Sequence, residues 1–228
     1  MTPPTPSTTE RVLVVAKAPV PGRSKTRLGA EVGDHRAAAL AAASLLDVLE
    51  AATSTVGAQG CHLALDGDLA DGVQSEELRD ALAGWTVRRQ GEGDLGRRLA
   101  DAHAELGPGP VVQVGMDTPQ LTAGLLHEVL AGLDDHDAVL GPATDGGWWA
   151  LALRDPARAA VLGEVPMSTP TTYADTRAAL EATGLRVTDA PDLTDVDTAE
   201  DAGEVAAAAP ASRFAREWTR RSDREAAR

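Results

Sequence analysis

Residues 11–28 read RVLVVAKAPVPGRSKTRL, a strand that runs into a positively charged loop. The apolar run from Val12 to Ala16 is typical of a strand covered on both faces. Two prolines and a glycine then indicate a loop, which carries four cations: Lys17, Arg23, Lys25 and Arg27. Because ligands of open α/β folds bind beyond the carboxyl ends of the strands, we expect this loop to line a ligand site.

The two lysines of the chain, Lys17 and Lys25, both lie in this loop, and every other positive charge is an arginine. An ammonium group acts as a compact point charge that suits phosphate, so the loop predicts a phosphate site. The alternative is a set of ordinary exposed loop cations. A P-loop is excluded, because its pattern ending at Lys25-Thr26 requires glycines where the chain has Pro19 and Ser24.

Length and charge limit the classes of protein to consider. The 228 residues suit one large α/β domain, and a net charge of -14 argues against a surface that binds nucleic acid or anionic membrane. The single cysteine, Cys61, excludes an intramolecular disulfide and a thiolate metal site. Residues 1–10 lack the features of a signal peptide, and no membrane span is expected. We therefore expect a cytoplasmic protein with a disordered N-terminus at residues 1–10.

Strand-like and helix-like segments alternate along the chain, which predicts a mostly parallel sheet. We expect strands at 12–16, 61–65, 85–88, 110–115, 137–141, 148–153 and 185–187, and helices at 33–56, 76–83, 97–106 and 167–182. The predicted fold is a single Rossmann-like α/β domain at residues 11–210, with three α/β/α layers and a mixed sheet. Residues 211–228 are expected to form a helical tail for docking or for a partner.

Two further stretches could meet a ligand. Gln90, Gly93 and Asp94 lie in QGEGDLG, where glycines let the backbone approach a flat ligand and Gln90 offers a donor and an acceptor. The alternative is an ordinary strand-to-helix turn with Asp94 at the helix N-terminus. In GPATDGGWW, Gly146 and Gly147 indicate a floor close under a ligand, with one of the two tryptophans packed beside it.

Three aspartates are candidate metal ligands. Asp117 follows the strand at 110–115 and precedes Pro119, so we expect it at the carboxyl tip of a central strand, where it could hold Mg²⁺ or Mn²⁺. Its alternative role is to cap the helix that starts near Thr122. Asp195 and Asp197 are two apart in PDLTDVDTAED and could share a cation, while Asp197 or Thr198 could cap the next helix.

Five segments in this order resemble one family: AKAPVPGRSKTRL, QGEGDLGRRL, GMDTPQL, GPATDGGWW and DLTDVDTAED. They are similar to the DUF2064 group of the nucleotide-diphospho-sugar transferase (glycosyltransferase A) superfamily, which also contains the guanylyltransferases of molybdenum-cofactor and coenzyme F420 synthesis. The resemblance implies phosphate contacts from Lys17, Gly22, Lys25 and Arg27, with Arg23 in the same loop. It places Gln90, Gly93 and Asp94 near the base or ribose, and makes Asp117, with Asp195 or Asp197, the metal ligands.

Three functions are then compatible with the sequence. The first is metal-dependent glycosyl transfer from a nucleotide-sugar to a small-molecule acceptor, with Lys25 and Asp117 catalytic, Asp145 as general base and Gly146, Gly147 and Trp148 near the substrate. The second is nucleotidyl transfer from a nucleoside triphosphate, which the four loop cations favour on charge. The third is non-catalytic nucleotide binding. A homo-oligomer is left open.

Overall fold

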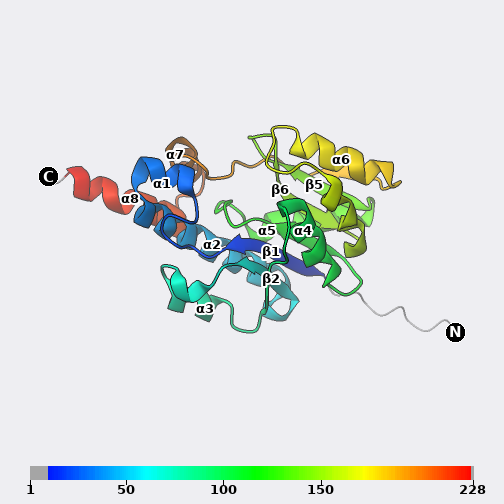
Figure 1. Cartoon of the computed structure of the whole chain (residues 1–228), viewed down its shortest axis with the longest axis horizontal. Coiled ribbons are helices and arrows are strands. Elements are labelled where there is room, and N and C mark those ends of the chain that lie inside the picture. The colour runs from blue at the N-terminus through cyan, green and yellow to red at the C-terminus, as the bar shows by residue number, and fades with distance from the viewer. Residues whose placement is uncertain (1–9, 227–228) are drawn as a thin grey trace.

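The computed structural model describes residues 10–226, and side chains up to residue 220. Its centre is a seven-stranded sheet with the strand order β3-β2-β1-β4-β6-β5-β7 (Figure 1). The strands are β1 (Arg11–Lys17), β2 (Cys61–Asp66), β3 (Thr86–Arg89), β4 (Val111–Val114), β5 (Ala138–Pro142), β6 (Trp148–Leu153) and β7 (Val187–Asp189). The predicted N-terminal disorder falls, except for Glu10, outside the described residues.

Strand direction brings the ends of six strands and the start of one to the same edge of the sheet. β1 pairs in parallel with β2 and β4, β2 with β3, and β5 with β7. β6 runs antiparallel to both β4 and β5, so its first residue, Trp148, lies at the carboxyl edge of the parallel strands. The predicted α/β class with a mostly parallel mixed sheet is confirmed.

Helices cover both faces of the sheet and complete the three layers. One face packs against α2 (Asp34–Val56), α3 (Ser75–Ala81) and α5 (Ala123–Ala131). The other packs against α4 (Leu95–Ala104), the 3-10 helix η4 (Pro156–Glu164) and α6 (Thr172–Ala182). Short 3-10 helices are η1 (Ala58–Gly60), η2 (Leu69–Asp71) and η3 (Gly132–Asp134).

The middle of strand β1, from Val12 to Ala16, is apolar because both of its faces are covered. Val12 and Val14 point into the cluster beneath α2, whereas Leu13 points into the cluster beneath α4. Each fully buried aliphatic side chain of this kind contributes about 1.5–3 kcal/mol by leaving water. Burial on both faces therefore holds β1 in the middle of the molecule and fixes where its charged carboxyl end emerges.

Helix α2 is the one described helix that is long and apolar enough to span a membrane by length and composition. The expectation that no such stretch exists was therefore too strict. However, 78% of the relevant window is buried inside the protein, because residues such as Leu45 and Leu49 pack on the sheet. α2 is the core helix of the domain.

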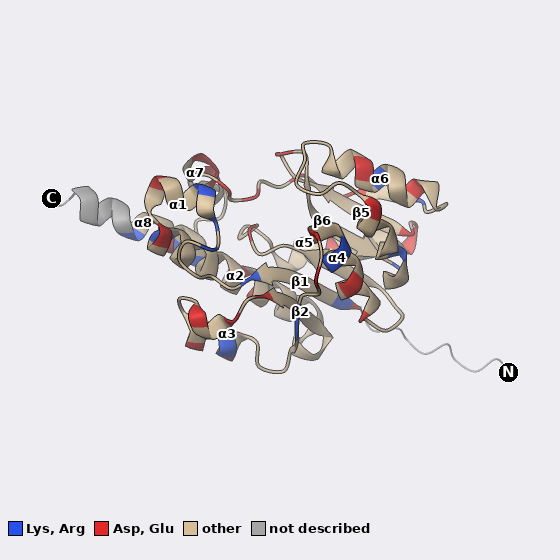
Figure 2. Cartoon of the chain, in the orientation of Figure 1, with Lys and Arg blue, Asp and Glu red and all other residues tan. Residues whose placement is uncertain are grey.

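A third cluster joins α1 (Thr26–Val32), α7 (Ala199–Ala208) and α8 (Arg213–Ala226) at one end of the molecule (Figure 1). Phe214 of α8 is buried against Leu28 and Leu40, and the Asp47 carboxylate accepts hydrogen bonds from the backbone N–H groups of Arg213 and Phe214. The C-terminal helix thus docks on its own chain. Acidic residues occur along α3, α6 and α7 (Figure 2).

Candidate functional site

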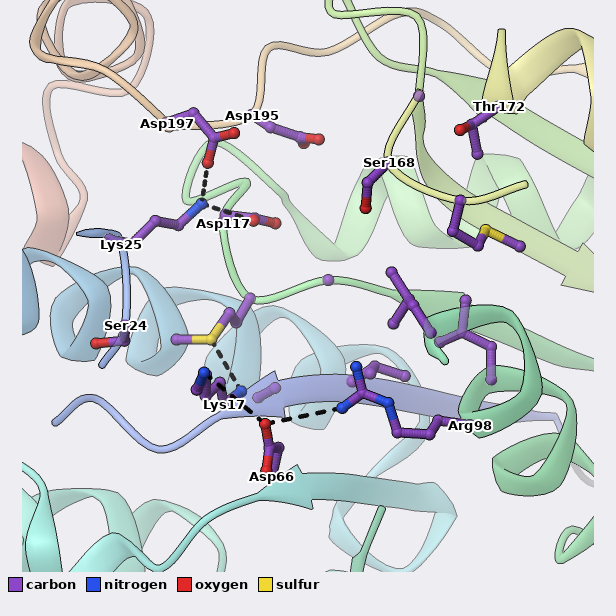
Figure 3. A pocket seen from close by; sticks show the side chains of 18 of the residues that line it. Lys17, Ser24, Lys25, Asp66, Arg98, Asp117, Ser168, Thr172, Asp195 and Asp197 are labelled. Carbon is purple, nitrogen blue, oxygen red and sulfur yellow. Dashed lines mark hydrogen bonds and ion pairs between the residues drawn. The ribbon is translucent and has the colours of Figure 1, made fainter. Parts of the chain in front are cut away.

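A cleft of about 540 Å³ opens at the carboxyl edge of the sheet, over β1, β2 and β4. Its charged lining consists of five cations and five carboxylates: Lys17, Arg23, Lys25, Arg27, Arg98, Asp66, Asp117, Asp145, Asp195 and Asp197. The structure therefore brings together residues from β1, β2, α4, β4 and two later loops. Figure 3 shows two charged groups in this cleft, one around Lys25 and one around Lys17.

Lys25 lies between two carboxylates from distant parts of the chain. Its Nζ donates to Asp117 Oδ2 at 2.7 Å and to Asp197 Oδ1 at 2.8 Å, and its side chain is only 12% exposed. Burial alone would lower the pKa of Lys25, but the charges of Asp117 and Asp197 outweigh it and raise that pKa. Lys25 is therefore held as an ammonium ion in a nearly enclosed site.

The backbone around Lys25 has the left-handed conformation, with φ 48° and ψ 49°, immediately before α1 begins at Thr26. Such a conformation costs a non-glycine residue roughly 1–2 kcal/mol. Arg27, the second residue of α1, donates to Asp197 Oδ2 at 3.3 Å from a largely exposed position. The ion pairs of Lys25 offset the backbone cost and tie the loop to the far wall of the cleft.

Asp117 follows β4 and the turn residue Gly115. A Cβ on Gly115 would lie 2.7 Å from Asp117 Oδ1, so glycine is needed there for the carboxylate to fold back over the strand end. The alternative that Asp117 caps the following helix is wrong, because Thr122 Oγ1 accepts the hydrogen bond from the Leu125 N–H. Asp117 is left to face Lys25.

Asp195 and Asp197 come from the segment before α7. Between them Val196 is buried and donates its N–H to the Asp117 carbonyl at 3.0 Å, which places both aspartates beside β4. Thr198 and Asp201 form the capping box of α7, so the capping role falls to Thr198 and leaves Asp197 for Lys25. Burial and the nearby charge of Asp117 raise the pKa of Asp195 to about 8.

Whether Asp117, Asp195 and Asp197 suit a divalent cation can be judged from their oxygen atoms and the partners of those atoms. Asp195 Oδ1 is buried without a hydrogen-bond partner, and carboxylate oxygen suits Mg²⁺ or Mn²⁺. Within residues 10–220, no three His, Cys, Asp or Glu side chains are arranged to hold a metal as they stand. The position between Asp117 and Asp197 is taken by the Lys25 ammonium. The oxygen donors fit such a cation once Lys25 moves away.

The other charged group lies around Lys17, at the end of β1. Lys17 Nζ is 4.0 Å from Asp66 Oδ2, and the Arg98 guanidinium is 3.7 Å from the same oxygen. Asp66 and Arg98 line the cleft but were not among the predicted site residues. For Asp66, the acidic Asp66-Gly67-Asp68 turn at the end of β2 is a sequence feature that could have indicated it. Strand register brings Lys17 and Asp66 side by side.

Gln90 lines the cleft, but its amide is used to hold the protein together. Its Nε2 donates to the carbonyls of Ala16 at 2.9 Å and Ala64 at 3.1 Å, and its Oε1 accepts from Arg98 at 2.8 Å. The prediction that Gln90 offers its amide to a base edge is corrected by these contacts. Gln90 instead positions the ends of β1 and β2 and the side chain of Arg98.

Four predicted residues do not line the cleft. Asp94 caps α4 by accepting the Arg97 N–H at 2.9 Å, which is the alternative that the sequence left open. Gly22 and Gly93 lie in turns with positive φ. Gly146 has φ 89°, and a Cβ there would lie 2.1 Å from the Pro170 carbonyl oxygen. Gly146 therefore allows the loop before β6 to touch the loop before α6.

The remaining wall of the cleft comes from β6 and the start of α6. Trp148 lines the cleft and donates from Nε1 to Thr176 at 3.1 Å, whereas Trp149 is buried in the core. Asp145 Oδ1 accepts the Gly147 N–H at 2.8 Å at the rim. Three hydroxyl-bearing residues that the sequence analysis did not predict also line the cleft: Ser168, Thr169 and Thr172. Figure 3 shows Ser168 and Thr172 on the side where α6 begins. The run of Ser and Thr at the start of α6 is the sequence signal that could have indicated them.

A profile of the family described as "Uncharacterized protein conserved in bacteria (DUF2064)" matches residues 48–169, more than half of the chain. The chain belongs to the DUF2064 family. The match includes Asp66, Asp117 and Asp145 but ends before Asp197 and begins after Lys25. The Lys25 contacts therefore connect two segments outside the matched region, those of Lys25 and Asp197, with Asp117 inside it.

Solved structures similar to this DUF2064 protein share its whole fold. A candidate nucleotide-diphospho-sugar transferase from Desulfovibrio desulfuricans G20 is 27% identical, with a TM-score of 0.82 and 96% of each chain covered. A CMP:2-keto-3-deoxy-manno-octonic acid synthetase complexed with CTP is 13% identical, with a TM-score of 0.56, 87% of this chain and 97% of that chain covered.

The 4-diphosphocytidyl-2C-methyl-D-erythritol synthase of Anaerococcus prevotii DSM 20548 is 12% identical, with a TM-score of 0.55, 85% of this chain and 95% of that chain covered. Among curated proteins no match was found. At these identities the two cytidylyl-type enzymes show the fold alone. The fold is that of the nucleotide-diphospho-sugar transferases, as the sequence motifs implied.

Proposed function

We propose that this DUF2064 protein is a metal-dependent transferase that moves a glycosyl group from a nucleoside diphosphate-sugar to a small-molecule acceptor. The observation that carries the proposal is that cations of the cleft are already paired with carboxylates: Lys25 and Arg27 with Asp117 and Asp197, and Lys17 and Arg98 with Asp66. The similarity to the Desulfovibrio protein, which is named for nucleotide-diphospho-sugar transfer, supports the same class.

Charge counting connects the cleft to the ligand. A nucleoside diphosphate-sugar carries about two negative charges, which a divalent cation neutralises, whereas a triphosphate with the same ion keeps about two. The cations Lys25 and Arg27 already face Asp117 and Asp197, and Lys17 faces Asp66. Cations that are already paired with carboxylates match the neutral metal–diphosphate ligand better than the more highly charged metal–triphosphate.

The residues of the cleft would then share the work of the reaction. Asp117, with Asp195 and Asp197, would hold Mg²⁺ or Mn²⁺, which supplies neutralisation of the charge that grows on the departing diphosphate. Lys25, Arg23 and Arg27 would hold the phosphate oxygens from the loop after β1. Asp145, at the rim beside Trp148, would take the proton from an acceptor hydroxyl.

The second candidate is nucleotidyl transfer, in which a substrate phosphate attacks a nucleoside triphosphate and pyrophosphate leaves. The specific observation in its favour is that all four cations of the loop, Lys17, Arg23, Lys25 and Arg27, line the cleft. Like glycosyl transfer, this reaction needs Lys25 and Arg27 to release their carboxylate partners to the metal and to turn to phosphate, here that of the triphosphate.

The experiment that decides between them is a product screen. The purified protein is incubated with each nucleoside triphosphate and with a panel of nucleotide-sugars and sugar or sugar-phosphate acceptors, with Mg²⁺, with Mn²⁺ and with EDTA. Metal-dependent release of a nucleoside diphosphate supports glycosyl transfer, whereas release of pyrophosphate supports nucleotidyl transfer. An Asp145→Asn variant serves as the catalytic control, since it should keep donor binding and lose product. Donor binding without either product would contradict both reactions.

A further inference from the structure

The Lys25 ammonium stands where the carboxylates of the cleft would hold a divalent cation. Its Nζ lies 2.7 Å from Asp117 Oδ2 and 2.8 Å from Asp197 Oδ1, while Asp195 lies beside them with a buried, unpartnered Oδ1 (Figure 3). The three aspartates come from the end of β4 and from the segment before α7, so their backbone positions are set by elements other than the loop that carries Lys25.

We propose that Lys25 is an internal counter-ion, which occupies the cation position in the nucleotide-free protein and leaves it when phosphate binds the loop. Divalent metal then enters the site together with the nucleotide rather than before it. This inference rests on the proposed function, because it assigns an order of binding to the same site.

The Lys25 ammonium and a divalent metal cannot both occupy the position between Asp117 and Asp197, because both are positively charged. An ammonium ion and a dication between the same two carboxylates would repel each other at short distance. Metal–oxygen distances of about 2.0–2.6 Å are also shorter than the two Nζ–oxygen distances, so a metal bound to the oxygens that Lys25 now uses would leave no room for the ammonium between them. Bare metal must therefore compete with a tethered cation.

From its position in the loop, the Lys25 side chain can move from the carboxylates to a phosphate bound in the same cleft. Its side chain is a flexible four-carbon stem with a terminal point charge, and Arg23 and Arg27 of the same loop line the same cleft. Phosphate oxygens drawn to this loop offer Lys25 a charge-assisted partner within the cleft. Lys17 is different, because its nearest carboxylate, Asp66, lies at the end of β2 and away from the three aspartates (Figure 3).

The first test compares metal binding without nucleotide. Lys25→Met keeps the length of the side chain and removes its charge, and Lys17→Met is the matched control with the same change in net charge. Calorimetry with Mn²⁺ alone should show binding at least tenfold tighter in Lys25→Met than in the wild type, and no such gain in Lys17→Met. Adding Asp117→Asn to Lys25→Met should remove the gain. Equal Mn²⁺ affinity in Lys25→Met and the wild type would overturn the proposal.

A second test uses the unchanged protein and does not depend on the folding of a variant. Because the chain has only two lysines, labelling with ε-¹³C-lysine gives two resonances, which Lys17→Met assigns. Mg²⁺ alone should leave the Lys25 signal in place, whereas magnesium pyrophosphate should shift it. A shift of Lys25 by Mg²⁺ alone, or an unmoved Lys25 signal with magnesium pyrophosphate, would contradict the exchange.

The outcomes separate this inference from the proposed function. If Lys25→Met gains Mn²⁺ affinity and pyrophosphate moves Lys25, but no nucleotide-sugar is cleaved, the exchange stands and the reaction assignment fails. If nucleotide-sugar is cleaved but Lys25→Met binds Mn²⁺ like the wild type, the reaction stands and the exchange fails.

Discussion

The two lysines of the chain lie at the two ends of one cleft, in different electrostatic surroundings. At the Lys25 end, the ammonium contacts Asp117 and Asp197 within 2.8 Å, and the side chain is 12% exposed. At the Lys17 end, the ammonium is 4.0 Å from Asp66 and the side chain is 47% exposed. One lysine is mostly buried between two carboxylates, and the other is a solvated charge.

The difference comes from how each end is built. Lys17 and Asp66 are register partners on neighbouring parallel strands, so their proximity follows from the sheet alone. The partners of Lys25 are 92 and 172 residues away along the chain and meet it only when β4 and the segment before α7 close on the loop. Charges that meet through long-range closure are more buried, so we expect substitutions at the Lys25 end to cost more.

The largest effect should come from Asp117→Asn. The amide keeps the shape but lacks the charge that attracts a hard dication, so metal-dependent nucleotide binding should weaken by about a thousandfold, about 4 kcal/mol. Calorimetry with Mn²⁺ present measures it. Asp68→Asn, which changes the charge equally at the cap of η2, is the control and should bind nucleotide normally. A normal Asp117→Asn would remove the metal assignment from this end.

The second effect concerns the stability of the protein around α4. This helix carries Arg98, which lies near Asp66 at the Lys17 end of the cleft, and the buried His103. Burial lowers the pKa of His103 from 6.5 to about 4, and its ring contacts Gln113 at 2.9 Å. Between pH 6.5 and 4 the unfolded chain binds a proton that the folded protein excludes, so stability should fall as the pH falls.

His103→Gln removes this titrating group. Between pH 7 and pH 4, the free energy of unfolding of the wild type should therefore fall by about 3 kcal/mol more than that of the variant. Urea unfolding at a series of pH values measures the difference. Parallel pH profiles for the two proteins would show that His103 does not govern the acid sensitivity of α4.

The third effect compares the two lysines directly. Lys25→Ala should weaken binding of the metal–nucleotide complex by about thirtyfold, about 2 kcal/mol, because it removes a charge-assisted phosphate contact. Lys17→Ala should cost about threefold, because its solvated charge is screened. Affinities at two salt concentrations check both values. Equal losses would mean that the two ends of the cleft grip the ligand alike.

The smallest effect should come from Arg27→Ala, because the Arg27 side chain is 79% exposed. If the loop grips a diphosphate, binding of a nucleotide-sugar and of a triphosphate should weaken similarly, by about threefold. A loss at least tenfold larger for the triphosphate, about 1.4 kcal/mol, would instead favour nucleotidyl transfer. Both affinities are measured at one fixed Mg²⁺ and salt concentration.

Several elements could be predicted from the sequence because their signals are local. The apolar run of β1, the alanine- and leucine-rich α2 and the Thr198 cap depend on periodicity and capping within a few residues. Short elements were missed, among them α1 and η4. Helix α1 was interpreted as loop, since Gly33 with φ 89° separates it from α2, and the irregular 3-10 helix η4 has no clear periodicity.

The sequence by itself determined that a cationic loop leaves a buried strand and that Asp117, Asp195 and Asp197 lie at strand ends or helix starts. Only the tertiary structure decided which charges meet. It pairs Lys25 with two of these carboxylates and turns the Gln90 amide inward to two backbone carbonyls. The physical reason is the separation along the chain over which each interaction acts. Periodicity and capping depend on residues within one turn or one strand. The Lys25 ion pairs join residues 92 and 172 positions apart, so they depend on how the sheet and helices pack together.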